Sequence, residues 1–175
     1  MTRTIPLIAL TLALSACDRF PITYPPPEQR HPVEGANPAA GNMMIEMDSP
    51  DASQHVVKDV RDNPGGLWRW TGQEPTFKIL VWVTDNIKLK ADFTLWDEAF
   101  RQTGPLDLQF FVNDKLLDDV RYTTSGHKHF EKPVPPDWLP TDIESTIAIK
   151  LDKLYVAPQD GAKFGIILSR IGFEQ

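Results

Sequence analysis

Tryptophans next to charged side chains are the residues of this sequence that could bind a ligand. Trp68 and Trp70 flank Arg69, so in an extended strand both rings face one way and the guanidinium faces the other. Paired rings can stack on the apolar face of a sugar, and an arginine can bind a hydroxyl or a carboxylate. The alternative is that both tryptophans belong to the core beneath a sheet.

Two further tryptophans lie beside carboxylates. Trp96 falls on the polar side of an alternating segment and is followed by Asp97, and Trp138 follows Asp137 in a proline-rich loop. An exposed ring beside a carboxylate suits stacking combined with hydroxyl recognition. Exposed single tryptophans also serve as loop anchors, so both interpretations stay open.

A short histidine motif could bind a metal. If residues 125–131 are extended, His127, His129 and Glu131 project to one side, and this set of ligands suits zinc or a non-haem metal. No other histidine or cysteine cluster supports such a site. We therefore favour a solvated strand face and predict no cofactor, while calcium between loop carboxylates is neither supported nor excluded.

Motifs for catalysis are missing from the sequence. Ser125 and Lys128 form S-x-x-K, but without the helix start and the K-T-G strand that this chemistry needs. There is no G-x-S-x-G, no glycine-rich phosphate loop and no H-E-x-x-H. The neighbouring carboxylates of Asp118 and Asp119 would point to opposite faces of a strand. We expect a binding protein and not an enzyme.

The single cysteine ends an apolar N-terminal run. Arg3 precedes the apolar residues 5–13, and the small residues Ser15 and Ala16 come directly before Cys17, which is the order of a secretory signal. One cysteine also has no partner for an internal disulfide.

The letters LSAC, which end at Cys17, resemble the lipobox of bacterial lipoproteins. This resemblance implies cleavage before Cys17 and acylation of its thiol and its freed amine, and two or more acyl chains give a stable membrane anchor. Asp18 resembles the signal that retains lipoproteins of the enterobacterial kind at the inner membrane. The expected location is therefore the periplasmic face of the inner membrane rather than the outer membrane. An ordinary secretory signal with a chance cysteine is the alternative.

These features divide the chain into a signal peptide at residues 1–16, a lipidated N-terminus with a linker at residues 17–42, and a folded domain at residues 43–175. The linker is rich in proline and poor in apolar side chains, so burial cannot offset its ordering entropy and we expect a disordered, extended tether. A polyproline ligand at PPPEQRHP is the alternative.

Apolar side chains alternate with polar ones along the folded domain, with turn residues between the runs. This pattern predicts a single all-β domain, an antiparallel β-sandwich. Asn113 and Asp114 should form a tight hairpin turn, residues 164–174 should be buried on both sides or change face at a bulge, and Trp82 should be buried. The inward-facing positions are expected to be Ile87, Leu89, Ala91, Phe93, Leu95, Leu106, Leu108, Phe110, Val112, Ile147, Ile149 and Leu151.

The negative net charge of the chain argues against nucleic acid as a partner. The formal net charge is -6 without a basic cluster, so the chain gains nothing from counterion release and nucleic acid is not an expected partner.

The segments RWTG at residues 69–72, FFVND at 110–114 and FGIILSRIGFE at 164–174 resemble jelly-roll, galactose-binding-like sandwich domains. The resemblance covers residues 67–175 and implies binding of a carbohydrate or an envelope polymer, without catalytic residues. The alternative is an envelope adaptor that holds a protein partner at an edge strand or at an apolar patch around Phe111 and Val120.

Overall fold

The computed structural model describes residues 43–63, 65–141 and 143–175. The predicted signal peptide, Cys17, Asp18 and the linker at residues 17–42 lie outside the described residues. Within the described ranges, no helix combines the length and the apolar character needed to cross a membrane.

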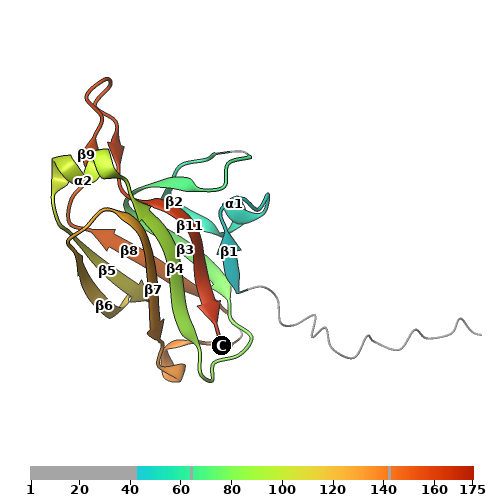
Figure 1. Ribbon diagram of the computed structural model, residues 1–175. Coiled ribbons are helices and arrows are strands. Elements are labelled where there is room, and N and C mark those ends of the chain that lie inside the picture. Colours follow the sequence, from blue (N-terminus) through green and yellow to red (C-terminus); the bar gives the residue numbers. More distant parts are fainter. Residues whose placement is uncertain (1–42, 64, 142) are drawn as a thin grey trace, which may run out of the picture. The chain divides into compact units, whose positions relative to one another are not determined.

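The described chain consists mainly of β-strands, which Figure 1 shows in sequence colours. Helices are limited to α1 (Ala52–His55), α2 (Asp97–Thr103) and the 3-10 turn η1 (Pro136–Trp138). The strands are β1 (Met44–Glu46), β2 (Val56–Val60), β3 (Arg69–Leu80), β4 (Lys88–Leu95), β5 (Leu106–Val112), β6 (Lys115–Tyr122), β7 (Gly126–Pro133), β8 (Glu144–Leu151), β9 (Tyr155–Val156), β10 (Lys163–Phe164) and β11 (Ile167–Glu174).

The strands pair in an antiparallel order that nearly closes on itself. Their order is β6-β5-β8-β3-β11-β4-β7, with β1 beside β11 and β2 beside β3, while β9 and β10 form a separate ribbon. Strand β3 links two groups of strands, which we call the two halves of the domain. Its start pairs at Arg69 with β11, which continues to β4 and β7, and its end pairs from Thr76 to Leu80 with β8, which continues to β5 and β6. The prediction of an antiparallel β-sandwich is confirmed, because the antiparallel sheets close nearly into a barrel or sandwich.

The core lies between the two halves, and every position predicted to face inward is buried. Phe110 of β5 and Phe130 of β7 come from distant strands of the order and stack with ring centroids 3.6 Å apart. Alternation alone identified these positions, because a strand with one buried face places every second side chain in the core.

The last strand changes its buried face at a bulge, which is one of the two alternatives that the sequence left open. The register of β11 against β4 shifts between Leu168 and Arg170. The buried side chains change with it, from Leu168 on one parity to Ile171 and Phe173 on the other.

The prediction for Trp82 is wrong, since its side chain is 46% exposed. Burial continues to alternate past Leu80, the last residue of β3, because Val81 is buried and Trp82 is exposed. Trp82 shares the face of Leu80, which is only half-buried, so this face is not covered as the sequence analysis expected.

Candidate functional site

Five aromatic side chains gather at one end of the domain. Trp68 and Trp70 come from the start of β3, Trp96 directly precedes α2, and Tyr155 and Phe164 belong to β9 and β10. In Figure 1 this end carries the labels α2 and β9. We call these five residues the aromatic cluster.

Trp70 lies at the centre of the aromatic cluster. Its ring centroid is 6.1 Å from Trp68, 5.9 Å from Trp96 and 5.1 Å from Phe164, and Trp96 lies 5.5 Å from Tyr155. The Trp68, Trp96 and Tyr155 contacts in this series are edge-to-face, an arrangement that aromatic pairs favour. The rings therefore hold one another at fixed angles.

Two tryptophans of the aromatic cluster are open to solvent. Trp68 is 39% exposed and Trp96 is 41% exposed, while Tyr155 is buried beneath them. The large exposed side chains of Leu67 and Val156 adjoin the cluster in sequence. Exposed apolar side chains gathered in one place indicate an interaction surface more often than scattered ones do.

The short ribbon that completes the aromatic cluster is held in two ways. The side-chain amide of Gln102 in α2 exchanges hydrogen bonds with the backbone of Val156, at 2.9 and 3.2 Å. The guanidinium of Arg61 lies 4.3 Å from the ring centroid of Phe164, a cation–π contact, and it also donates to the Lys163 carbonyl. The sequence analysis missed Arg61, Tyr155 and Phe164, and the only sequence signal for the ribbon was an aromatic residue on each side of a Gly-containing turn.

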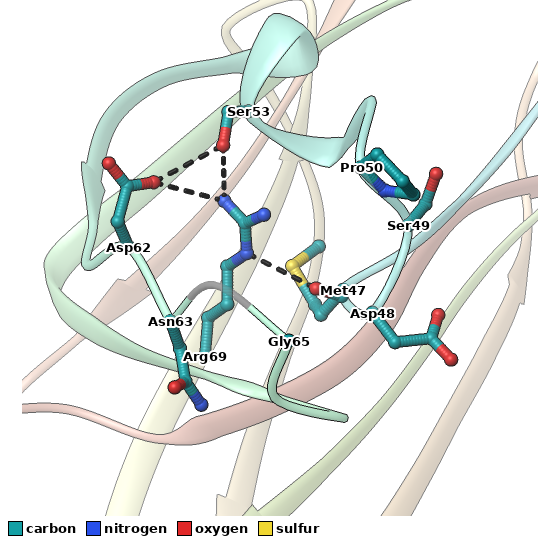
Figure 2. A pocket seen from close by; sticks show the side chains of 9 residues that line it. All are labelled: Met47, Asp48, Ser49, Pro50, Ser53, Asp62, Asn63, Gly65 and Arg69. Carbon is teal, nitrogen blue, oxygen red and sulfur yellow. Dashed lines mark hydrogen bonds and ion pairs between the residues drawn. The ribbon is translucent and has the colours of Figure 1, made fainter.

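Arg69 lies on the opposite side of β3, buried with 5% of its surface exposed. Its Nε donates to the carbonyl of Met47, and its Nη1 donates to Ser53 and Asp62 (Figure 2). The prediction that Arg69 and the two tryptophans face opposite sides of the strand is therefore correct. The alternative that both tryptophans belong to the core is wrong for Trp68, which is exposed, and holds only in part for Trp70, which is half-buried. The segment between β1 and α1 covers the Arg69 side of the strand, while Trp96 and Phe164 of the small ribbon pack against Trp70 on the other side.

The other predicted binding residues divide between two ends of the domain. Asp97 begins α2 beside Trp96, in an exposed first turn. Trp138 lies instead near the end of β5, where its carbonyl accepts a hydrogen bond of 2.7 Å from Asn113 and its ring packs partly against the core. The structure therefore brings Trp68, Trp70, Trp96 and Asp97 together and leaves Asp137 and Trp138 apart.

The histidine motif forms an exposed face of β7, as predicted. His127, His129 and Glu131 are all exposed. Glu131 lies 2.6 Å from Lys88 and 3.2 Å from Lys90, and the hydrogen bonds from these ammonium groups lower its pKa to about 2. No group of three or more His, Cys, Asp or Glu side chains within the described ranges is arranged to hold a metal ion.

No protein-family model matches the chain, and no curated protein is similar to it at the level that would indicate a common family. Among solved structures, the chain is similar to a family GH115 4-O-methyl-α-glucuronidase with specificity for decorated arabinogalactans. The TM-score is 0.38 at 12% identity, over 62% of this chain and 14% of the chain of that enzyme. A likeness of this size carries no argument about function, which has to come from the side chains of this protein.

Proposed function

We propose that this chain is a non-catalytic binding module of the bacterial envelope, which takes up a carbohydrate or an envelope polymer on the aromatic cluster. An acylated Cys17 would hold it at the periplasmic face of the inner membrane. The observation that carries the proposal is the set of edge-to-face rings that ends in the two exposed tryptophans, Trp68 and Trp96.

The arrangement of the aromatic cluster suits a saccharide. The C–H face of a sugar ring can pack on Trp68 or Trp96, and rings held by their neighbours lose little conformational freedom when a ligand binds. Polar groups adjoin the rings, because Asp97 follows Trp96 in the chain and Arg61 lies over Phe164. A carboxylate can accept hydrogen bonds from sugar hydroxyls, and a guanidinium can donate to them.

A protein partner is the second candidate, because Leu67 and Val156 extend the exposed apolar surface beside the cluster. Aromatic rings with apolar neighbours are typical of the centre of a protein interface. The patch expected around Phe111 and Val120 supports this candidate less, since both side chains are half-buried and Val120 packs against the core.

The test is a titration of the full-length chain in detergent with peptidoglycan fragments, lipopolysaccharide core oligosaccharides and neutral oligosaccharides, followed by tryptophan fluorescence. We expect a saturable change with one class of ligand. Trp68→Ala and Trp96→Ala should each weaken binding by about tenfold, because removal of a central aromatic contact typically costs more than 1 kcal/mol.

Trp82→Ala is the matched control for this titration. Trp82 is exposed to a similar degree, but it follows the other end of β3 and has no ring contact among the described residues. The proposal fails if no ligand gives a saturable change, or if Trp82→Ala weakens binding as much as the cluster variants do. Crosslinking in membranes would then test the protein partner.

A further inference from the structure

A pocket opens on the Arg69 side of β3, away from the aromatic cluster. Its volume is about 420 Å³, within the range of small-molecule sites. Figure 2 shows its residues, which come from the segment between β1 and α1, from α1 and from the loop before β3. Its polar lining includes Asp48, Ser49, Ser53, Asp62 and Arg69.

The guanidinium of Arg69 uses only part of its hydrogen-bonding capacity within the protein. Nε donates to the Met47 carbonyl at 3.2 Å, and Nη1 donates to Ser53 Oγ at 2.7 Å and to Asp62 Oδ1 at 3.3 Å. Nη2 makes no hydrogen bond with a described residue, and Figure 2 shows it directed toward the side of the pocket that Ser49 and Pro50 form. Two N–H donors are therefore available to a ligand.

The positive charge of the buried Arg69 is only weakly compensated by ion pairing. Its one ionic contact is with Asp62, whose side chain is 77% exposed and which also accepts a hydrogen bond from Ser53. Water weakens an ion pair when one partner is so exposed. A buried charge is normally paired and hydrogen-bonded, so a guanidinium with one weakened ion pair, whose Nη2 makes no hydrogen bond with a described residue, favours an anionic partner in the pocket.

The remaining lining groups limit what can bind there. Ser49 Oγ accepts a hydrogen bond of 3.3 Å from the Asp51 amide, which leaves its own O–H free to donate. The carboxylate of Asp48 is turned away from Arg69 in Figure 2, so it does not neutralise the guanidinium. With Asp48 and Asp62 both in the lining, a small ligand of single negative charge fits better than a multiply charged one.

We propose that this pocket binds a small carboxylate, with a carboxylate oxygen that accepts a hydrogen bond from Nη2 of Arg69. This site is distinct from the aromatic cluster, because Arg69 and its neighbours Trp68 and Trp70 face opposite sides of β3. A guanidinium and a carboxylate form a charge-assisted hydrogen bond, which is stronger than a neutral one.

The test is an NMR titration of the full-length chain in detergent with sodium acetate, at an ionic strength held constant with sodium chloride. Acetamide, a neutral molecule of nearly the same shape, is the matched ligand. Acetate should shift the side-chain Nε–H of Arg69 and the amides of Ser49 and Ser53 with saturation, and acetamide should not. The indole N–H signals of Trp68 and Trp96 should stay unchanged, which separates this result from binding at the aromatic cluster.

Two substitutions should change the affinity in opposite directions. Arg69→Met should abolish the acetate response. Asp62→Asn removes the competing charge while its amide oxygen can still accept from Arg69, so the acetate Kd should fall by roughly two- to fivefold. Asp85→Asn, which changes an exposed acid outside both this pocket and the aromatic cluster, should leave the Kd unchanged.

Asp62→Asn keeps the test decisive even if Arg69→Met does not fold, because Asp62 lies at the surface. The proposal is overturned if acetate gives no saturable shift, if acetamide gives the same shift, or if Asp62→Asn and Asp85→Asn bind acetate with equal affinity.

Discussion

At the scale of single residues, the carboxylate of Asp92 joins β4 to side chains of both neighbouring strands, His129 of β7 and Arg170 of β11. Its side chain accepts a hydrogen bond from Arg170 and lies 2.6 Å from Nδ1 of His129. Burial raises the pKa of Asp92, but the hydrogen bonds with His129 and Arg170 outweigh it, and the pKa is lowered from its ordinary value of 3.8. The charged form is therefore favoured by folding.

Asp92→Asn should lower the free energy of unfolding by about 1–2 kcal/mol at pH 7, since it removes charged hydrogen bonds at a largely buried site. A lowered folded-state pKa means that this stabilisation is present above the unfolded-state pKa and is lost as the pH falls through the folded-state pKa. The difference in the free energy of unfolding between wild type and variant should thus be largest above about pH 5 and should decrease at lower pH.

Urea denaturation at a series of pH values measures this difference in stability, with Asp85→Asn as an exposed loop control that should differ little from wild type. A difference that stays constant down to pH 2 would show that the charge of Asp92 does not stabilise the fold.

The sequence described individual residues correctly where alternation inside a strand governs them. It placed Trp96 at the surface and His127, His129 and Glu131 on one exposed face, and both placements are correct. It failed for Trp82, because alternation shows which side chains share a face but not whether the second face is covered. It also had no means of showing that Arg69 is buried, because the covering segment that includes Met47 and Ser53 lies elsewhere in the sequence.

At the scale of elements, the turn between β5 and β6 agrees with the prediction in full. Asn113 and Asp114 have φ values of 48° and 61°, the left-handed conformation that a two-residue hairpin turn requires. The side chain of Asn113 is also structural, because it donates to the Trp138 carbonyl and accepts a hydrogen bond from the Thr146 amide at 2.7 Å. The side chain of Asp114 is exposed.

Asp114→Gly should therefore raise the free energy of unfolding by up to about 1 kcal/mol, because glycine adopts positive φ without steric cost and Asn-Gly suits this turn. Asn113→Gly also removes the steric cost of positive φ, but it deletes the hydrogen bonds of the Asn113 side chain with Trp138 and Thr146. It should therefore lower the free energy of unfolding by about 1–2 kcal/mol. Chemical denaturation of both variants tests the pair. An equal effect of the two glycines would show that the Asn113 side chain contributes nothing.

The ribbon of β9 and β10 could not be predicted from the sequence. Each strand has two residues, too few for a period to be visible in the sequence. Its position depends on contacts with distant parts of the chain, through Gln102 of α2 and through Trp70 of β3. The aromatic cluster could therefore be predicted only for its tryptophans.

At the scale of the whole molecule, β3 joins the two halves of the sandwich. Its Thr71 is fully buried, and Thr71 Oγ1 accepts a hydrogen bond of 2.9 Å from the amide of Ile166. A side chain at Gly165 would meet the backbone of Gly72 at 2.4 Å, so the chain before β11 can approach β3 this closely only with glycine there. The same crossing point places Trp70 beside Phe164.

Attachment of the whole molecule to the membrane is a prediction from the sequence. Cys17→Ser should abolish incorporation of labelled palmitate and move the protein from the membrane fraction to the soluble envelope fraction. Asp18→Ser should keep the label but shift the protein toward outer-membrane fractions in a sucrose gradient. Unchanged labelling of Cys17→Ser would contradict the lipoprotein assignment.

The all-β class, the inward-facing positions and the hairpin at Asn113 could be predicted from the sequence, because each depends on residues that are neighbours along one strand or turn. The contacts of Trp68, Trp70 and Trp96 with Tyr155 and Phe164, and the place of Arg69 at the base of a pocket, became visible only in the folded chain. Those contacts join segments far apart in the chain, and they depend on how β3 crosses between the two halves, which no local pattern of side chains encodes.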